Sequence, residues 1–289
     1  MALPQIQDLL EAGVHFGHQT SRWNPKMRKF IFAERNGIYI IDLKKTLRQI
    51  ELAQELVRGV ISRGDRVLFV CTKKQLKPVV VSAAERSNSF HVTERWLGGM
   101  LTNFTTIKKQ IRRLRELERG MEEGAFEFYT KKERLMLDRE RERLDKYLSG
   151  VKDMARLPGV LFVIDSKREK IAISEANKLG IPVVAIADTN ADPDLLTVPI
   201  AGNDDAIRSV EVIGDAIADA IIEARAAMPA EDRRRSEEPE VTTYSSETGA
   251  SQPADRGDDR GQKRRPRRKR RPRADAIPGA PSEGGEGEG

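Results

Sequence analysis

Residues 160–187, VLFVIDSKREKIAISEANKLGIPVVAIA, contain two apolar runs separated by a helical pattern. The runs, residues 160–164 and 182–187, are rich in β-branched side chains and do not alternate with polar ones. Such uniformly apolar runs are typical of parallel strands that are buried on both faces. A strand, a helix and a second strand in this order predict a β-α-β unit at the centre of the fold.

The same kind of pattern extends in both directions along the chain. We expect further strands at residues 66–71, 90–92 and 197–200. We expect helices at residues 43–63, 75–87, 168–179 and 204–227, the last with Asn203 as its N-cap. Asn36 and Gly37, which lie between two apolar runs, predict a tight β-hairpin before these elements. Together they predict an α/β fold built on a doubly wound parallel sheet.

Residues 103–150 have a different pattern, in which apolar side chains recur with spacings of three and four. The polar segment 122–125 interrupts it, and Thr130 with Glu133 forms a capping box that starts a second helix. We therefore expect an antiparallel coiled-coil hairpin that projects from a globular domain of residues 1–102 and 151–228. The expected seam residues are Ile107, Ile111, Leu114, Met121, Leu137, Leu144, Leu148 and Val151.

Residues 229–289 form a tail with 14 basic and 13 acidic side chains and few large apolar ones. Such a composition cannot offset the entropy of an ordered chain, so we expect this tail to be disordered. Its segment 263–273, KRRPRRKRRPR, holds nine cations in eleven residues and is a candidate RNA tether. The cations are Lys263, Arg264, Arg265, Arg267, Arg268, Lys269, Arg270, Arg271 and Arg273.

The composition excludes several classes of protein. The chain has a formal net charge of +6 and a single cysteine, Cys71, so it has neither an intramolecular disulfide nor a Cys-x-x-Cys metal site. A reducing compartment is the simpler interpretation. The first residues lack the pattern of a signal peptide, and Asp215 and Asp219 interrupt the most apolar helix. We therefore expect a cytoplasmic protein with no membrane span.

The segment 13–29, GVHFGHQTSRWNPKMRK, combines cations with aromatic rings in an irregular stretch. Cations neutralise phosphates and flat rings stack on unpaired bases, so this mixture suits RNA. A solvated basic loop whose aromatic rings lie in the core explains the composition equally well. His15 and His18 could share a metal ion, but no third ligand is near in sequence, and a structural role is favoured.

The segment 95–104, RWLGGMLTNF, lies between the third expected strand and the hairpin. We assign Arg95 and Asn103 to contact with a nucleic-acid backbone. Trp96 and Leu101 instead anchor the hairpin to the sheet. Lys73 and Lys74 follow the strand 66–71 in a turn without glycine, so no Walker loop and no Gly-x-Gly-x-x-Gly motif is present there.

Three acidic loops follow expected strands and contain Asp165, Asp188 and Asp204. Loops at the carboxyl ends of parallel strands bind ligands in doubly wound folds, so these carboxylates could hold Mg²⁺ in a phosphoryl-transfer enzyme. Helix capping and turn formation explain the same residues without catalysis. No Ser/His/Asp or Cys/His nucleophilic set stands out, so the enzyme remains the alternative hypothesis. A coiled-coil scaffold with incidental basicity is a third.

Six stretches in one order resemble the bacterial small-subunit ribosomal protein S2 family, over about residues 6–227. They read HFGHQTSRWNPKM from residue 15, FIFAERNGIYIIDLKKT from 30, FVCTKKQ from 69, RWLGGMLTNFTTIKK from 95, PGVLFVIDSKREKIAISEANKLGIPVVAIADTNADPD from 158 and PIAGNDDAIRS from 199. The resemblance implies a flavodoxin-like sheet with a coiled-coil hairpin and a structural function in the 30S subunit. It implies no catalysis, cofactor, metal or small-molecule substrate.

The resemblance also implies partners and RNA-contacting residues. The implied partners are small-subunit ribosomal RNA, neighbouring 30S proteins and, in many bacteria, ribosomal protein S1. It assigns RNA contact to the basic N-terminal loop and to the hairpin rather than to the acidic loops. The residues carried over from the family are Arg22, Trp23, Asn24, Lys26 and Arg28. The predicted RNA-binding set also contains residues chosen from the chain's own pattern, which are Lys73, Lys74, Arg95, Asn103, Lys108, Lys109, Arg112 and Arg113.

Overall fold

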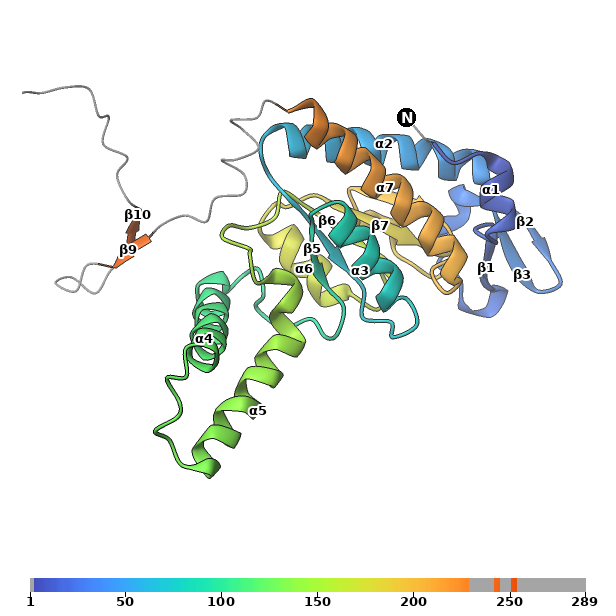
Figure 1. Cartoon of the computed structure of the whole chain (residues 1–289). Coiled ribbons are helices and arrows are strands. Elements are labelled where there is room, and N and C mark those ends of the chain that lie inside the picture. The colour runs from blue at the N-terminus through green and yellow to red at the C-terminus, as the bar shows by residue number, and fades with distance from the viewer. Residues whose placement is uncertain (1–2, 229–241, 245–250, 254–289) are drawn as a thin grey trace, which may run out of the picture. The chain divides into compact units, whose positions relative to one another are not determined.

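The structure is a computed structural model that describes residues 3–228 and two short strands, β9 (Thr242–Tyr244) and β10 (Ser251–Pro253). Residues 3–228 belong to one compact unit (Figure 1). The strands β9 and β10 pair antiparallel in the second unit of the chain, where no secondary structure was predicted. The cationic segment 263–273 lies outside the described residues.

A parallel five-stranded sheet forms the centre of the first unit, with the strand order β5-β4-β6-β7-β8. Each run that predicted a strand forms one, so the α/β, doubly wound fold is confirmed. In register, Val70 lies between Val92 and Val163. The strands are β4 (Val67–Val70), β5 (Phe90–Val92), β6 (Val160–Val163), β7 (Val183–Ala187) and β8 (Val198–Ala201).

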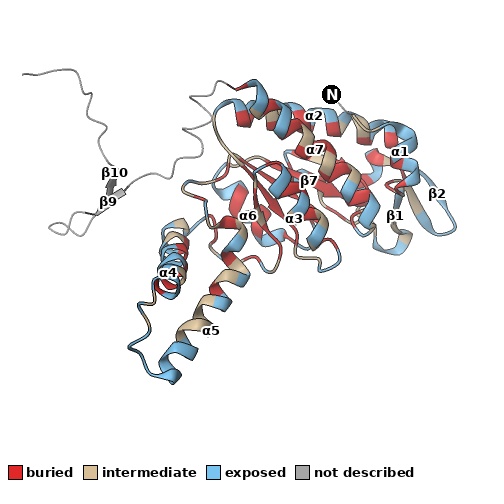
Figure 2. Cartoon of the chain, viewed as in Figure 1, coloured by how far each residue is buried: buried red, intermediate tan, exposed pale blue. Residues whose placement is uncertain are grey.

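Both faces of this sheet are covered, which explains why its strands are apolar without alternation (Figure 2). Phe69 and Phe162 point to one face and meet edge to face at 5.2 Å. Leu68 and Leu161 point to the other face. The first face packs against α1 (Ile6–Glu11), α2 (Leu43–Ser62), α3 (Lys77–Arg86) and α7 (Ile207–Ala227), and the second against α6 (Lys170–Lys178) and the base of the hairpin.

A second, antiparallel sheet forms near the N-terminus with the order β1-β3-β2. Asn36 and Gly37 have φ values of 52° and 74°, the left-handed conformation that a two-residue hairpin turn requires, so the predicted hairpin is confirmed. The strand β1 and the helix α1 were not predicted. The strands are β1 (Phe16–Gln19), β2 (Ile31–Arg35) and β3 (Ile38–Ile41).

Helices α4 (Phe104–Glu122) and α5 (Lys131–Leu148) occupy the segment predicted as a hairpin, and both run away from the sheet in Figure 1. The capping box of Thr130 and Glu133 is present. The seam prediction was wrong at Met121, which is exposed, whereas Leu117 is fully buried. At the base, η3 (Ser149–Val151) contains Gly150, which packs so closely on His91 that a Cβ would collide with the His91 carbonyl oxygen.

Three predicted helices begin later in the structure than expected. Helix α7 begins at Ile207 with Ala206 at its N-cap, so the prediction that Asn203 caps it was wrong. The side chain of Asn203 instead accepts hydrogen bonds from the backbone N–H groups of Asp205 and Ala206, which stabilises a turn before the helix. Helices α3 and α6 each begin two residues later than predicted.

Candidate nucleic-acid interface

The N-terminal loop is held in place by Asn24. Its Oδ1 accepts a hydrogen bond from the backbone N–H of Lys26 at 3.1 Å, which caps the short helix η2 (Pro25–Phe30). Its backbone N–H donates to the carbonyl oxygen of Thr189 at 2.8 Å. Asn24 therefore fixes the loop to the carboxyl end of β7, and its predicted RNA contact would have to use the side-chain amide nitrogen.

The cations of this loop differ in what they contact. The Nζ of Lys26 lies 2.9 Å from Asp192 and 2.8 Å from Asp194, and hydrogen bonds to these carboxylates raise the pKa of Lys26. Lys26 therefore ties the loop to η4 (Pro193–Leu195). Arg22 and Arg28 are exposed and have no ion pair within residues 3–228. Of the cations of this loop that were predicted to bind RNA, Arg22 and Arg28 therefore remain available to phosphates.

Trp23 is neither a core residue nor fully exposed. It is half-buried, and its ring lies 5.1 Å from that of Tyr39 on β3, at an interplanar angle of 46°. Phe16, the other large aromatic residue of segment 13–29, is 49% exposed. The structure therefore contradicts the interpretation in which the aromatic rings of this segment lie in the core, because Phe16 and part of Trp23 are accessible for stacking.

The loop 95–103 is organised by Glu175, a buried residue of α6. The Glu175 carboxylate accepts five hydrogen bonds, from the Trp96 ring nitrogen, the backbone N–H groups of Gly99, Leu101 and Thr102, and the Thr102 hydroxyl, at 2.8–3.1 Å. Burial favours the neutral acid, but these donors outweigh it and lower the pKa of Glu175. A buried carboxylate thus takes the place of backbone acceptors for the N–H groups of Gly99, Leu101 and Thr102.

Glu175 fixes the residues on either side of the glycine pair. Trp96 and Leu101 are buried, so the prediction that they anchor the hairpin to the sheet is confirmed. Arg95 and Asn103 remain exposed at the two ends of the loop. The Asn103 Oδ1 accepts a hydrogen bond from the Thr106 hydroxyl at 2.8 Å, and this contact does not use the amide N–H groups of Asn103.

The predicted cations of α4 also fall into two groups. Arg113 forms a two-point ion pair with Glu140 of α5, with distances of 3.2 and 3.1 Å, and Lys108 lies 5.0 Å above the ring of Phe104. Lys109 and Arg112 are exposed and have no ion pair among the described residues. The buried residues of α4 face α5, so these two cations lie outside the helix contact.

Lys73 occupies the carboxyl edge of the sheet rather than the surface. Its Nζ lies 2.9 Å from Asp165, 2.9 Å from Asp204 and 2.8 Å from Asp205, and its side chain is 17% exposed. Burial lowers the pKa of Lys73, but the three carboxylates outweigh burial and raise it. Lys73 was predicted to bind RNA, yet its charge is already balanced inside the protein. Lys74, the next residue, is exposed.

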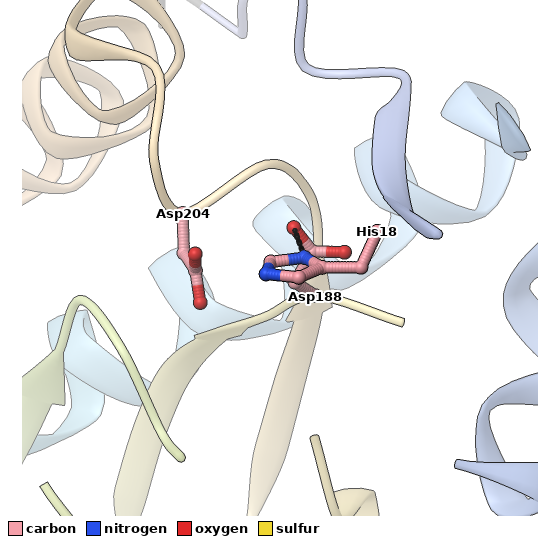
Figure 3. A group of neighbouring side chains, drawn as sticks. All are labelled: His18, Asp188 and Asp204. Carbon is pink, nitrogen blue, oxygen red and sulfur yellow. Dashed lines mark ion pairs between the residues drawn. The ribbon is translucent and has the colours of Figure 1, made fainter. Parts of the chain in front are cut away.

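His18, Asp188 and Asp204 form the group within residues 3–228 that could hold a metal ion, with ligand atoms within 4.8 Å of one another (Figure 3). The Nδ1 of His18 lies 2.9 Å from Asp188, and this contact raises the pKa of His18. Burial and the nearby Asp165 raise the pKa of Asp204 to about 7. The trio predicted from the sequence was Asp165, Asp188 and Asp204. In the structure Asp165 contacts Lys73 instead, and His18 is the third member of the group.

Comparisons with a family model and with known proteins both find similarity over most of the chain. The model of the family described as Ribosomal protein S2 matches residues 9–224. The "Small ribosomal subunit protein uS2" of Syntrophobacter fumaroxidans (strain DSM 10017 / MPOB) is 53% identical over 247 residues, which cover 86% of this chain and 87% of the relative. The chain belongs to the ribosomal protein S2 family. The resemblance seen in the six sequence stretches is therefore confirmed.

Membership of the ribosomal protein S2 family makes the chain a structural component of the small ribosomal subunit and not an enzyme. Its partners are accordingly ribosomal RNA and other proteins of that subunit. The magnesium-dependent enzyme built on Asp165, Asp188 and Asp204 has no support from the family or from the relative. No helix of the described residues combines the length and the apolar composition needed to cross a bilayer.

Sequence reasoning missed several residues that shape the candidate interface of this S2-family chain. The sequence pattern predicted only that Glu175 lies in a helix. An acidic residue among the apolar positions of α6 could have indicated a buried carboxylate with hydrogen-bond donors around it. Tyr39 was assigned to a strand and not to the Trp23 ring. The pairing of His18 with Asp188 joins residues that are distant in the chain, and no local pattern reports it.

Proposed function

We propose that this S2-family chain binds small-subunit ribosomal RNA through the exposed cations that have no internal partner. The supporting observation is the division of the predicted cations into two groups. Lys26, Lys73 and Arg113 are neutralised by carboxylates of the chain itself. Apart from Lys108, which is partly buried and lies over the Phe104 ring, the remaining cations are exposed and have no ion pair within residues 3–228. They are Arg22, Arg28, Lys74, Arg95, Lys109 and Arg112.

The unpaired cations suit an RNA backbone for an electrostatic reason. A phosphate gains most from a cation whose charge is not already balanced, because binding then releases counterions without breaking an internal ion pair. Trp23 adds a different contact, since a half-exposed ring can stack on an unpaired base. Asn103 adds amide donors at the start of α4, and Lys108 extends the cationic surface of this helix.

Some predicted residues have a supporting function in this proposal. Asn24 and Lys26 hold the N-terminal loop against the sheet, so they position Arg22, Trp23 and Arg28 rather than bind phosphate. Lys73 stabilises the acidic loops in the same way. Arg113 joins α4 to α5 and keeps the arm formed by these two helices together.

The domain organisation and the finer partners belong to the same proposal. We assign residues 103–150 to a coiled-coil arm and residues 1–102 and 151–228 to the globular domain. We also propose docking of ribosomal protein S1 and a cytoplasmic location, which the family resemblance supports. The RNA tether at residues 263–273 is proposed from the charge of this segment alone. The tether lies outside the described residues.

Co-sedimentation tests the RNA proposal. The full chain is mixed with small ribosomal subunits that lack it, and its affinity is measured between 50 and 200 mM salt, a range in which several phosphate contacts change affinity strongly. The proposal predicts binding that weakens steeply with salt, and a shallower dependence for an Arg22→Gln/Arg28→Gln variant. Failure to co-sediment at low salt, or a salt dependence that is unchanged in the variant, would contradict it.

A further inference from the structure

Two cations that no sequence pattern singled out lie at the carboxyl edge of β6. Lys167 and Arg168 follow the strand in the turn that leads to α6, and both are exposed. Neither has an ion pair among the described residues, in contrast to Lys73 in the adjoining loop. Their position matters because β6 adjoins β4, whose own carboxyl-end loop carries the exposed Lys74.

The side chain of Arg168 is held in a defined position. Its Nε donates a hydrogen bond to the Thr72 hydroxyl at 2.8 Å, and this hydroxyl donates to the Glu169 carboxylate at 2.5 Å. The chain of contacts joins the loops after β4 and β6. It also leaves both Nη groups of Arg168 without a hydrogen-bond partner among residues 3–228. A guanidinium held at Nε can offer these two groups together to one phosphate.

Sheet topology extends this arrangement to a third loop. Strands β5, β4 and β6 are neighbours, and all three run parallel, so the loops at their carboxyl ends lie side by side. The loop after β5 carries the exposed Arg95. We call the exposed cations of these three loops the basic rim. It consists of Lys74, Arg95, Lys167 and Arg168.

The other half of the same edge has the opposite charge. The loops after β7 and β8 carry Asp188, Asp192, Asp204 and Asp205. The chain order reverses between β4 and β6, which is where doubly wound folds bind small ligands. Here the Lys73 ammonium and its carboxylates fill that crevice, so a small ligand would have to displace three ion pairs. The exposed cations of the basic rim lie outside this crevice and are accessible to a large ligand.

We propose that the basic rim is a second RNA-backbone site, in which Lys167 and Arg168 contact phosphates together with Lys74 and Arg95. The spread of the rim over three adjacent loops fits an extended polyanion better than a single anion. RNA is favoured over an acidic protein because the rim adjoins the cations of α4. Arg95 lies at one end of the loop before α4 and Asn103 at the other, so this loop connects the two cationic surfaces. This inference rests on the proposed function and adds a site to it.

A pair of matched double variants of the full chain tests the inference. Lys167→Gln/Arg168→Gln removes two cations from the rim. The control, Arg63→Gln/Lys178→Gln, removes one arginine and one lysine that are exposed at the ends of α2 and α6, at the opposite edge of the sheet. Salt-dependent binding to small subunits lacking the protein is measured for wild type and both variants, with melting temperatures to verify folding.

The rim variant should bind more weakly than wild type, with a log–log salt slope shallower by about 1.4, since each phosphate contact contributes about 0.7. The control should keep the wild-type slope. Equal slopes for the rim variant and wild type would overturn the inference while leaving the proposed function intact, whereas absence of binding by wild type would overturn both. A rim variant that loses binding to poly-glutamate but keeps its subunit affinity would assign the rim to an acidic protein and overturn the RNA site.

Discussion

Glu175 is the residue whose replacement tests how the loop before the arm is held. In Glu175→Gln, one acceptor oxygen becomes an NH₂ group that faces the N–H donors of the loop. We expect the free energy of unfolding to fall by about 2–3 kcal/mol, as for the loss of buried hydrogen bonds to a charged group. Urea denaturation measures it. The exposed neighbour Ser174 supplies a control, because Ser174→Ala should leave the value within about 0.5 kcal/mol.

The pH dependence of this difference provides a second readout. The pKa of Glu175 is lowered in the folded protein, so its stabilisation is complete above its unfolded value of about 4.3 and is lost as pH falls through the folded value. The stability gap between wild type and Glu175→Gln should therefore narrow below about pH 4.3. A gap that stays constant down to the acid transition would show that the carboxylate charge is not what holds the loop.

Trp23 separates stacking from charge at the N-terminal loop. Because its ring is half-buried on Tyr39, Trp23→Ala should weaken subunit binding by about 1–3 kcal/mol with little change in salt slope. Arg22→Ala should instead make the slope shallower by about 0.7. Trp23→Phe should retain part of the affinity. A lower melting temperature with unchanged affinity in Trp23→Ala would make Trp23 a structural residue and remove it from the interface.

The arm formed by α4 and α5 tests whether one helix carries the RNA contact. Lys109→Glu/Arg112→Glu reverses two exposed charges on α4 that have no ion pair among the described residues. We expect lower occupancy in purified small subunits and an unchanged melting temperature, because neither side chain lies in the buried seam. Quantitative mass spectrometry of the subunits measures occupancy.

The second helix supplies the control for this arm. Lys132→Glu/Arg139→Glu reverses the same two kinds of charge at exposed positions of α5. If the contact runs through α4, this variant should assemble like wild type. Equal losses in both variants would mean that the arm acts through its net charge, and no loss in either would remove the arm from the interface.

The tail is tested at the scale of the whole molecule. Truncation after Met228 removes the nine cations of segment 263–273, which lies outside the described residues. If about half of these cations meet RNA phosphates, the log–log salt slope should become shallower by roughly 3. The melting temperature should not change, because the core residues of both sheet faces that the structure describes lie before Pro229. Identical slopes for truncated and full-length protein would leave the tail without an RNA contact.

The sequence by itself determined most of the segments that become strands and helices, although it did not predict β1 and α1. A run such as residues 160–164 is apolar on both sides of its backbone, and the Asn36-Gly37 turn and the Thr130–Glu133 capping box involve neighbouring residues, so their physical causes are local. The family resemblance also needed only the chain. The helix cap predicted at Asn203 shows where local patterns are ambiguous. An asparagine can stabilise a turn or cap a helix equally well, and the path of the chain after β8 selects the turn.

Only the tertiary structure decided which charges are available. Lys26 pairs with Asp192 across 166 residues of sequence, and Glu175 binds donors more than 70 residues away. Such pairings depend on which loops the sheet brings together, and the order β5-β4-β6-β7-β8 sets this. The sequence around a cation does not show whether a carboxylate from a distant segment will pair with it. The fold therefore neutralised Lys73 and left Lys167 and Arg168 exposed, because the carboxylates that surround Lys73 come from the ends of two other strands.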